Sequence, residues 1–435
     1  MLPERFAADL VLGGLYVDLR PLSLDDAPEL LRASASTEVQ RYLRHRPGWT
    51  LDDVRAYIRS YDPFISTGQS VMFTIRLRTT GQVLGATGFH HIDPANESVE
   101  VGGTWLDPQF WRTPINSDCK RTLFAHAFDT AGAHRVSLQT DLRNERSQNA
   151  IIDLGATREA VLREDKLLGD GCFRTSVQFG ILCSEWPGVR AKLDVRLARP
   201  WRLPSPPPVR QVPVPTDTSP ATRAKGGLPP PLRFRRPVTL RGRYVELRPL
   251  ERGHIAQLAV AGRDPEIWRW LRIGPGRNEV EMGALVERLL AEQRLGEVLP
   301  FAIWSRTERR FVGIFRYLDI ERIDQSVELG TWIDSALWRT PINTEVKYLA
   351  LRHAFEKEHA HRVQLRTDSR NERSQQAIAR LGATREGTLR EHLKLEGGVY
   401  RSSVCFSILA SDWPGVRGEL ERKLERPWPA PTHAV

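Results

Sequence analysis

The sequence has 435 residues, which is too long for one ordinary domain and long enough for two. Apolar residues make up 40% and charged residues 27%, as in globular proteins, and no apolar run approaches the roughly 18 residues needed to span a bilayer. The net charge is +10. The segment from Arg190 to Arg243 holds 13 Lys and Arg residues and only 2 Asp and Glu residues, so the excess positive charge lies in this one segment. Such a segment favours a solvated linker over a nucleic-acid contact.

The cysteines and the N-terminal residues indicate in which cellular compartment the protein works and whether it binds a metal. The four cysteines, at 119, 172, 183 and 405, show neither a CxxC pair nor another metal-ligand spacing. In a chain of this length they are typical of buried thiols in a reducing compartment. The start, MLPERFAADL, lacks the basic segment and apolar core of a signal peptide. We therefore expect a cytoplasmic protein with no metal site and no membrane partner.

Several segments occur twice along the chain. WRTPIN begins at residue 111 and again at 338, RNERSQ at 143 and 370, and LGATRE at 154 and 381. Between 143 and 159, 14 of 17 residues are identical to those 227 positions later. A period this long indicates a duplicated domain rather than a solenoid. We predict a first domain over 1–200, a linker over 201–237 and a second domain over 238–430.

The predicted linker is rich in proline. Of the 30 prolines in the chain, 12 lie from Pro200 to Pro237. Such a composition cannot bury a core and favours extended polyproline conformation. We expect a semi-rigid, exposed tether.

Each copy predicts the same order of elements. In the first copy a strand at 16–21 precedes a helix that Ser23 and Asp26 open as a capping box, and a second helix follows. The alternating runs VMFTIRLR, QVLGATGFHHI and SVEVGGTWL then predict three antiparallel strands. After WRTPIN come a helix, a strand, a short helix, two strands and a last helix, which Trp186 and Trp413 are expected to dock. This order predicts an α+β fold, a mixed central sheet flanked by helices.

WRTPIN suits the start of a helix. Threonine is a good N-cap, and proline fits the first helical position because the N–H that it lacks would be unpaired there anyway. A helix start with free N–H donors and a positive dipole attracts phosphate. The N–H groups expected to be free belong to Ile342, Asn343 and Thr344 in the second copy and to Ile115, Asn116 and Ser117 in the first.

Taken in order, ELGTW, the WRTPIN turn with its helix, HRVQLRTD, NERSQQAIARLGATREGTLR and YRSSVCFSIL resemble the GNAT (Gcn5-related) acyltransferase superfamily. Each copy is most similar to the branch of ribosomal-protein N-terminal-amine acetyltransferases. The resemblance covers nearly all of both copies but not the linker. It implies two GNAT-like domains and an acyl-CoA-dependent N-acyltransferase with acetyl-CoA as cosubstrate. The implied acceptor is a protein N-terminal amine or a small-molecule amine, attacking directly in a ternary complex.

The resemblance also implies where acetyl-CoA binds. In the family a Q/R-x-x-G-x-G/A loop holds the pyrophosphate with backbone amides, and the thioester arm lies where two parallel strands, here ELGTW and HRVQLRTD, splay apart. Pro341 and Pro114 stand at the main glycine position, so we expect weaker or reshaped rather than absent binding. The expected cofactor-binding residues are Arg339, Thr340, Ile342, Asn343, Thr344 and Asn371 in the second copy and Arg112, Thr113, Ile115, Asn116, Ser117 and Asn144 in the first. Further candidates for phosphate contacts are Arg339, Lys347, Arg370 and Arg373.

Acetyl transfer to an amine needs a base for the ammonium, an acid for the thiolate and a donor for the oxyanion. The residues that match the family's glutamate base and the serine of the N-terminal-amine branch are Glu328 and Ser374 in the second copy and Glu100 and Ser147 in the first. The family's tyrosine acid is replaced by Ile378 and Ile151, which excludes a phenolic acid there.

Each candidate also has a purely structural interpretation. Glutamates that alternate along a strand commonly form a solvated face, and asparagine and serine commonly cap helices. The first copy has an extra glycine after Glu100 and has Asp118 where the second copy has Glu345. We therefore expect the second copy to be the better catalyst. Two other functions stay open: a pair of domains that bind acyl-CoA or a partner without turnover, and a nucleic-acid-associated protein that uses the basic linker.

Overall fold

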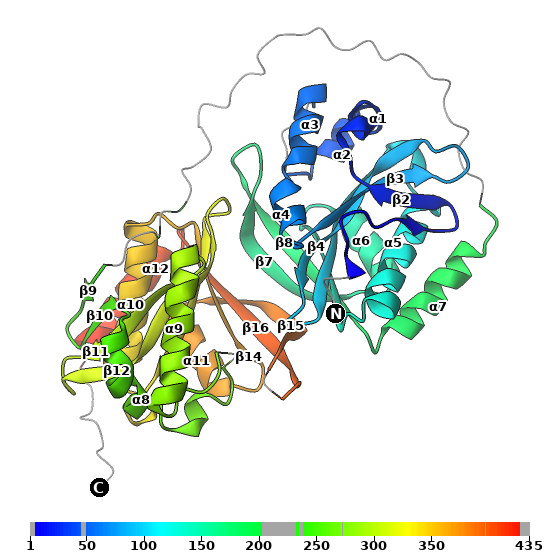
Figure 1. Cartoon of the computed structure of the whole chain (residues 1–435). Helices are drawn as coiled ribbons and strands as arrows, with labels where there is room; N and C mark the ends of the chain where they lie inside the picture. Colours follow the sequence, from blue (N-terminus) through cyan, green and yellow to red (C-terminus); the bar gives the residue numbers. More distant parts are fainter. Residues whose placement is uncertain are drawn as a thin grey trace. The chain divides into compact units, whose positions relative to one another are not determined.

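The computed structural model describes residues 5–44, 49–201, 232, 234, 238–271, 273–395 and 397–426 (Figure 1). The chain divides into two compact units. The first comprises Met1–Val161, Leu168–Pro229 and Arg390–His392, and the second comprises Leu162–Leu167, Pro230–Leu389 and Leu393–Val435. The predicted linker at 201–237 lies outside the described residues except at Trp201, Leu232 and Phe234. The last two side chains are buried in the core of the second copy.

In the first copy the strands follow the order β1-β2-β3-β4-β5-β6-β8-β7. They are β1 (Leu12–Gly13), β2 (Val17–Pro21), β3 (Val71–Leu77), β4 (Val83–Asp93), β5 (Ser98–Leu106), β6 (Arg135–Asp141), β7 (Thr157–Leu167) and β8 (Phe173–Leu182). The α-helices are α1 (Ala27–Ala33), α2 (Thr37–Gln40), α3 (Leu51–Arg59), α4 (Asp62–Ser66), α5 (Ile115–Ala125), α6 (Glu145–Asp153) and α7 (Trp186–Leu197). Pairing is antiparallel from β1 to β5 and between β6 and β8, and parallel between β5 and β6.

The second copy repeats this arrangement in the order β9-β10-β11-β12-β13-β14-β16-β15. Its strands are β9 (Leu240–Arg241), β10 (Val245–Pro249), β11 (Leu299–Ser305), β12 (Arg310–Glu321), β13 (Ser326–Ile333), β14 (Arg362–Asp368), β15 (Thr384–Lys394) and β16 (Tyr400–Leu409). The α-helices are α8 (Ile255–Ala261), α9 (Glu279–Leu295), α10 (Pro341–Glu356), α11 (Glu372–Arg380) and α12 (Trp413–Glu425). Among the described strand pairs of this copy, β13 and β14 run parallel and the others antiparallel.

Each sheet carries apolar side chains on both faces. In the first copy one core cluster joins the sheet to α5 and α7, and another joins it to α1 and α3. In the second copy α10 and α12 pack together over one cluster, and α8 and α9 pack together over the other (Figure 1). Because apolar residues alternate along the strands, each sheet can be covered from both sides. The predicted mixed sheet flanked by helices is thus confirmed.

A buried carboxylate on the helix after WRTPIN anchors the first hairpin of each copy. Asp118 accepts the backbone N–H groups of Leu15, Tyr16 and Val17 at 2.9, 2.7 and 3.0 Å. Glu345 accepts those of Arg243, Tyr244 and Val245 at 2.7, 2.6 and 2.7 Å. Since both carboxylates do the same structural work, the difference between Asp118 and Glu345 says nothing about which copy is the better catalyst.

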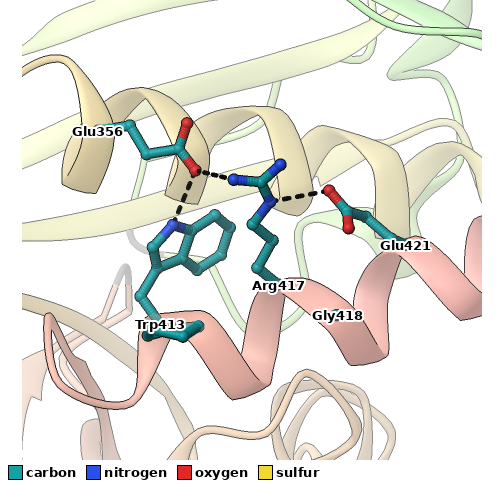
Figure 2. Close-up of a pocket in the computed structure, with 6 residues that line it drawn as sticks. Glu356, Trp413, Arg417, Gly418 and Glu421 are labelled. Carbon is teal, nitrogen blue, oxygen red and sulfur yellow. Dashed lines mark hydrogen bonds and ion pairs between the residues drawn. The ribbon is translucent and has the colours of Figure 1, made fainter.

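The last helix docks through a tryptophan in both copies, as predicted. Trp413 Nε1 donates to Glu356 at 3.0 Å, and Arg417 bridges Glu356 and Glu421 at 3.1 and 2.9 Å (Figure 2). In the first copy Trp186 Nε1 donates to Asp129 at 2.7 Å. The pocket in Figure 2 lies along this contact, and its charged groups are paired with one another, which identifies a helix-docking contact rather than a ligand site.

Candidate active site

The two parallel strands of each copy pair over only a short length. The β13–β14 ladder runs from Ser326–Arg362 to Glu328–Gln364, although β13 continues to Ile333 and β14 to Asp368. The β5–β6 ladder likewise ends at Glu100–Ser137. The predicted splay of these strands is therefore confirmed in both copies. It begins at the glutamates that the sequence singled out.

In the second copy the WRTPIN turn closes the end of β13 and opens α10. Trp338 Nε1 donates to the carbonyl of Ile333 at 3.1 Å. Thr340 Oγ1 donates to the carbonyl of Leu337 at 2.7 Å and accepts the N–H of Ile342 at 3.4 Å. The predicted N-cap at Thr340 is confirmed. The prediction of a free N–H at Ile342 is wrong, because the cap uses it, and the Ile342 side chain is buried in the core.

The first copy differs by one residue at this helix start. Thr113 makes the same two contacts, to the carbonyl of Phe110 at 2.6 Å and from the N–H of Ile115 at 3.4 Å. However, α5 begins at Ile115, with Pro114 in the N-cap position. The N–H of Ile115 is therefore also occupied, contrary to the prediction. No hydrogen bond is described for the other first-turn N–H groups, which belong to Asn116 and Ser117 in this copy and to Asn343 and Thr344 in the other.

The arginine of WRTPIN has a strained backbone in both copies. Arg112 has a φ of 60° and Arg339 a φ of 66°, and both side chains are exposed. The left-handed conformation costs a residue with a Cβ on the order of 1–2 kcal/mol. Such strain persists only where the surroundings fix the backbone, and it is common at ligand-binding turns. The turn therefore holds a guanidinium beside the start of the helix at a cost to stability.

Stacking joins the two repeated motifs. The guanidinium carbon of Arg373 lies 3.4 Å from the centroid of the Trp338 ring, and Arg146 lies 3.4 Å from that of Trp111. The arginine belongs to RNERSQ and the tryptophan to WRTPIN, so this contact brings the starts of two helices together. This pairing was not predicted from the sequence, although the presence of both residues in both copies was a signal for it.

The predicted asparagine and serine contacts are mainly structural. Asn144 accepts the N–H of Ser147 at 3.0 Å, and Asn371 accepts that of Ser374 at 3.1 Å. The asparagines are therefore N-caps, and only their amide nitrogens remain to contact a ligand. The serines lie half-buried in the first turns of α6 and α11.

Two of the four basic candidates are engaged by other protein groups. Arg370 is exposed, but Asp368 holds its guanidinium at 2.9 and 2.7 Å. Lys347 is buried, donates to Thr331 Oγ1 at 2.7 Å, and its pKa falls to about 7 because of burial. The prediction that Arg370 and Lys347 contact the phosphates is therefore wrong, because other protein groups hold both side chains. Arg339 and Arg373 remain as exposed candidates.

Glu328 is not free to act as a base. Its side chain is buried, and its carboxylate accepts from Arg366 Nε at 2.5 Å. Arg366 also pairs with Asp319. Burial raises the pKa of Glu328, while the charge of Arg366 opposes the rise. The carboxylate must break this ion pair before it can accept a proton from an amine.

Glu100 lies in a different setting. Its side chain is half-buried, and within the described residues no hydrogen bond or ion pair to its carboxylate is found. It stands opposite His90 on β4, where the extra glycine makes a bulge: Gly103 and Thr104 together face Thr87. The expectation that the second copy is the better catalyst is therefore not supported, because only the first copy leaves its glutamate available.

Neither a cluster of metal-binding side chains nor a membrane-spanning helix is found among the described residues. Across the described ranges, no group of three or more His, Cys, Asp or Glu side chains could hold a metal ion. No described helix is both long and apolar enough to cross a membrane.

Comparison with known proteins gives the following similarities. The family model described as "Acetyltransferase (GNAT) domain" matches residues 17–157 and 245–384. The uncharacterized N-acetyltransferase p20 of Bacillus licheniformis is 26% identical over 146 residues, which are 34% of this chain and 82% of that protein. The uncharacterized N-acetyltransferase YoaA of Bacillus subtilis is 23% identical over 146 residues, with the same two shares. Among solved structures, a putative acetyltransferase from T. thermophilus is 39% identical and covers 43% of this chain and 98% of its own, with a TM-score of 0.41.

Proposed function

The chain belongs to the GNAT acetyltransferase family and is an N-acetyltransferase, and on this premise we propose that it transfers the acetyl group of acetyl-CoA to a primary amine. The acceptor is the N-terminal amine of a protein or a small-molecule amine, which attacks directly in a ternary complex. The observation that carries the proposal is the splay of the parallel strands beside a helix start, repeated in both copies.

The residues at the WRTPIN turn suit a diphosphate. First-turn N–H groups and the positive end of a helix dipole attract anions. Arg339 and Arg373 add two exposed guanidinium groups at this point in the second copy. Burial lowers the pKa of Arg373, the nearby charge of Arg339 lowers it further, and Glu266 opposes both. An anion between the two arginines would relieve their mutual repulsion, which supports diphosphate binding here.

The reaction itself needs little covalent help. The neutral amine attacks the thioester carbonyl, the C–N bond forms, the C–S bond breaks, and the thiolate takes up a proton. The strand backbone beyond Glu100 no longer pairs with β6, and this end of the ladder supports the proposal that the unpaired backbone holds the donor arm. A thiolate is a good leaving group, so the proton acceptor for the amine is the main chemical requirement.

A second function is favoured for the second copy alone. There the Arg366–Glu328 ion pair occupies the acidic group at the end of the strand ladder. This supports acyl-CoA binding without turnover in that copy, with catalysis in the first.

Two measurements on the full chain test the proposal. Isothermal titration with acetyl-CoA should show binding, and CoA thiol release should depend on an added amine. Peptides with a free N-terminus, the same peptides blocked at the N-terminus, and small amines distinguish the acceptor classes. Absence of binding at millimolar acetyl-CoA, or binding without thiol release from any amine, would contradict the proposed reaction.

A further inference from the structure

His90 of the first copy has one ring nitrogen with no partner among the described residues. It lies on β4 directly opposite Glu100 on β5. Its Nε2 is inaccessible to solvent and has no hydrogen-bond partner in the described part of the chain, and Gly102 and Gly103 lie beside the ring. In the neutral tautomer that carries its proton on Nδ1, the Nε2 lone pair is available to accept a proton.

The bulge makes room for this nitrogen. A Cβ at Gly103 would lie 2.9 Å from His90 Nε2, and a Cβ at Gly102 would lie 3.3 Å from the ring carbon Cδ2 and 3.0 Å from a Glu100 oxygen. Because neither glycine carries a side chain, the His90 ring can pack this closely against β5. Nε2 therefore lies beside Gly103, in the part of β5 that follows the end of its ladder with β6 at Glu100.

The surroundings keep the ring neutral. Burial lowers the pKa of His90 to about 4, His91 on β4 and Lys120 on α5 act in the same direction, and Glu100 opposes them. Tyr61, just after α3, contributes a ring at 5.8 Å. His90 is therefore uncharged across the physiological pH range.

The second copy lacks this arrangement. Leu318 takes the place of His90 opposite Glu328, and the single Gly330 pairs regularly with Arg316. A Cβ at Gly330 would meet Arg316 Nε at 2.9 Å, so an arginine covers the position that the bulge opens in the first copy. The free imidazole nitrogen and the extra glycine therefore occur together in the first copy, and the second copy has neither.

From these contacts we infer that His90 Nε2 is the group that accepts the amine proton during acetyl transfer in the first copy. The inference rests on the proposed function. The amine nitrogen bonds to the thioester carbon and gives its proton to Nε2, the C–S bond breaks, and the imidazolium returns that proton to the thiolate. Glu100, opposite the ring, stabilises the transient positive charge. Most buried polar atoms have a hydrogen-bond partner, so the unpartnered Nε2 calls for an explanation, and a proton from the substrate amine supplies one.

The test measures amine-dependent CoA release by the full chain and acetyl-CoA affinity by titration. His90→Leu installs the residue that the second copy carries there, so the strand should still form. We expect kcat to fall about 100-fold with acetyl-CoA affinity unchanged within about twofold. Wild-type kcat should be flat from about pH 6 to 9, whereas that of the variant should rise with pH as hydroxide replaces the missing base. Imidazole added to His90→Ala should restore part of the rate.

The control is His91→Asn at the neighbouring, exposed position, where asparagine tolerates the φ of 47°. It should leave kcat unchanged. If His90→Leu retains the wild-type rate, or loses it equally at every pH without rescue by imidazole, His90 is not the proton acceptor, although the protein is still an acetyltransferase. If the wild type releases no CoA with any amine, the proposed function fails and this inference fails with it.

Discussion

At the scale of single residues, the arginine of WRTPIN has a strained backbone that glycine would relieve and an exposed guanidinium that glycine would lack. Arg339 occupies a left-handed backbone position that glycine would fill without strain, and its side chain is exposed. A residue that only shaped the turn would be better replaced by glycine. The persistence of arginine at this position in both copies therefore favours a role for the guanidinium.

We predict that Arg339→Gly keeps or raises stability while weakening acetyl-CoA binding. Relief of the left-handed strain should raise the free energy of unfolding by up to about 1 kcal/mol after the added chain entropy is subtracted. Loss of the guanidinium should lower the affinity of the second copy about tenfold, as expected for one charge-assisted contact. Thermal unfolding and titration of the full chain measure the two effects.

Arg339→Ala is the matched control for that change. Alanine keeps the backbone strain and removes the charge, so it should bind as weakly as the glycine variant without its gain in stability. Equal affinity of all three proteins would mean that Arg339 contacts no phosphate.

Lys347 is a second residue whose burial has a measurable consequence. Its pKa in the folded chain is about 7, against an ordinary value of 10.5, because burial disfavours the charge. Below pH 7 both the folded and the unfolded chain hold the proton. Between about pH 7 and 10.5 only the unfolded chain holds it, so the free energy of unfolding rises with pH in that window.

We predict that Lys347→Met raises stability at pH 7, on the order of 1–3 kcal/mol, and removes part of this pH dependence. Urea unfolding of the full chain at pH 7 and pH 9, followed by tryptophan fluorescence, gives both quantities. Lys120, which donates to Thr104 at 2.5 Å and whose pKa is lowered to about 8, allows the same comparison in the first copy. A loss of stability in Lys347→Met at both pH values would show that the bond to Thr331 outweighs the burial of the charge.

At the scale of elements, the copies differ where β5 and β13 leave their ladders. In the first copy two residues of β5 face Thr87, and in the second copy Phe315, Arg316 and Tyr317 pair one to one with β13. A bulge re-aims neighbouring side chains and bends the strand. The inserted glycine therefore makes a bulge that lies against His90 in the first copy, whereas Arg316 lies against the single Gly330 in the second.

We predict that Gly103→Ala abolishes most activity of the first copy through its effect on His90. The alanine pays the left-handed cost of a φ of 60°, on the order of 1 kcal/mol, and its Cβ would press on Nε2. Gly132→Ala is the control, because its φ is 72° and no atom lies within 4 Å of the added Cβ. Both variants should lose similar stability in thermal unfolding. If Gly103→Ala and Gly132→Ala release CoA at the same rate, the bulge has no role in catalysis.

Element order could be predicted from the sequence because its signals are local. Capping residues, alternating apolar runs and prolines at helix starts lie within a few residues of what they specify. The starts of α5 and α10, at Ile115 and Pro341, are one position apart, although Thr113 and Thr340 make the same capping contacts. The stacking of Trp338 on Arg373 depends on two helix starts that are far apart in the chain. No local pattern reports it.

At the scale of the whole chain, duplication gave the fold twice but not the same site twice. The resemblance to the GNAT family marked both glutamates as candidate bases, because each stands on the strand before the WRTPIN turn. What separates them lies on other strands: Arg366 on β14 pairs with Glu328, and His90 on β4 faces Glu100. Those relations depend on strand register, which a single sequence without known pairing does not supply.

We predict that the full chain binds two acetyl-CoA molecules and catalyses in one copy. Asn116→Asp and Asn343→Asp each place a carboxylate in the first turn of the helix, where it suits the dipole but repels a diphosphate. Each variant should keep its stability and bind one acetyl-CoA, and the double variant should bind none. Titration counts the sites, and thiol release with an accepted amine should be lost in Asn116→Asp and kept in Asn343→Asp.

Asn116→Ala and Asn343→Ala provide the uncharged controls for that experiment. Each removes the side-chain amide while leaving the backbone N–H groups, so acetyl-CoA affinity should fall far less than with aspartate. If backbone donors hold the diphosphate, charge rather than loss of the amide must be what abolishes binding. Turnover lost in Asn343→Asp and kept in Asn116→Asp would place catalysis in the second copy. Glu328 would then have to leave Arg366 when the amine arrives.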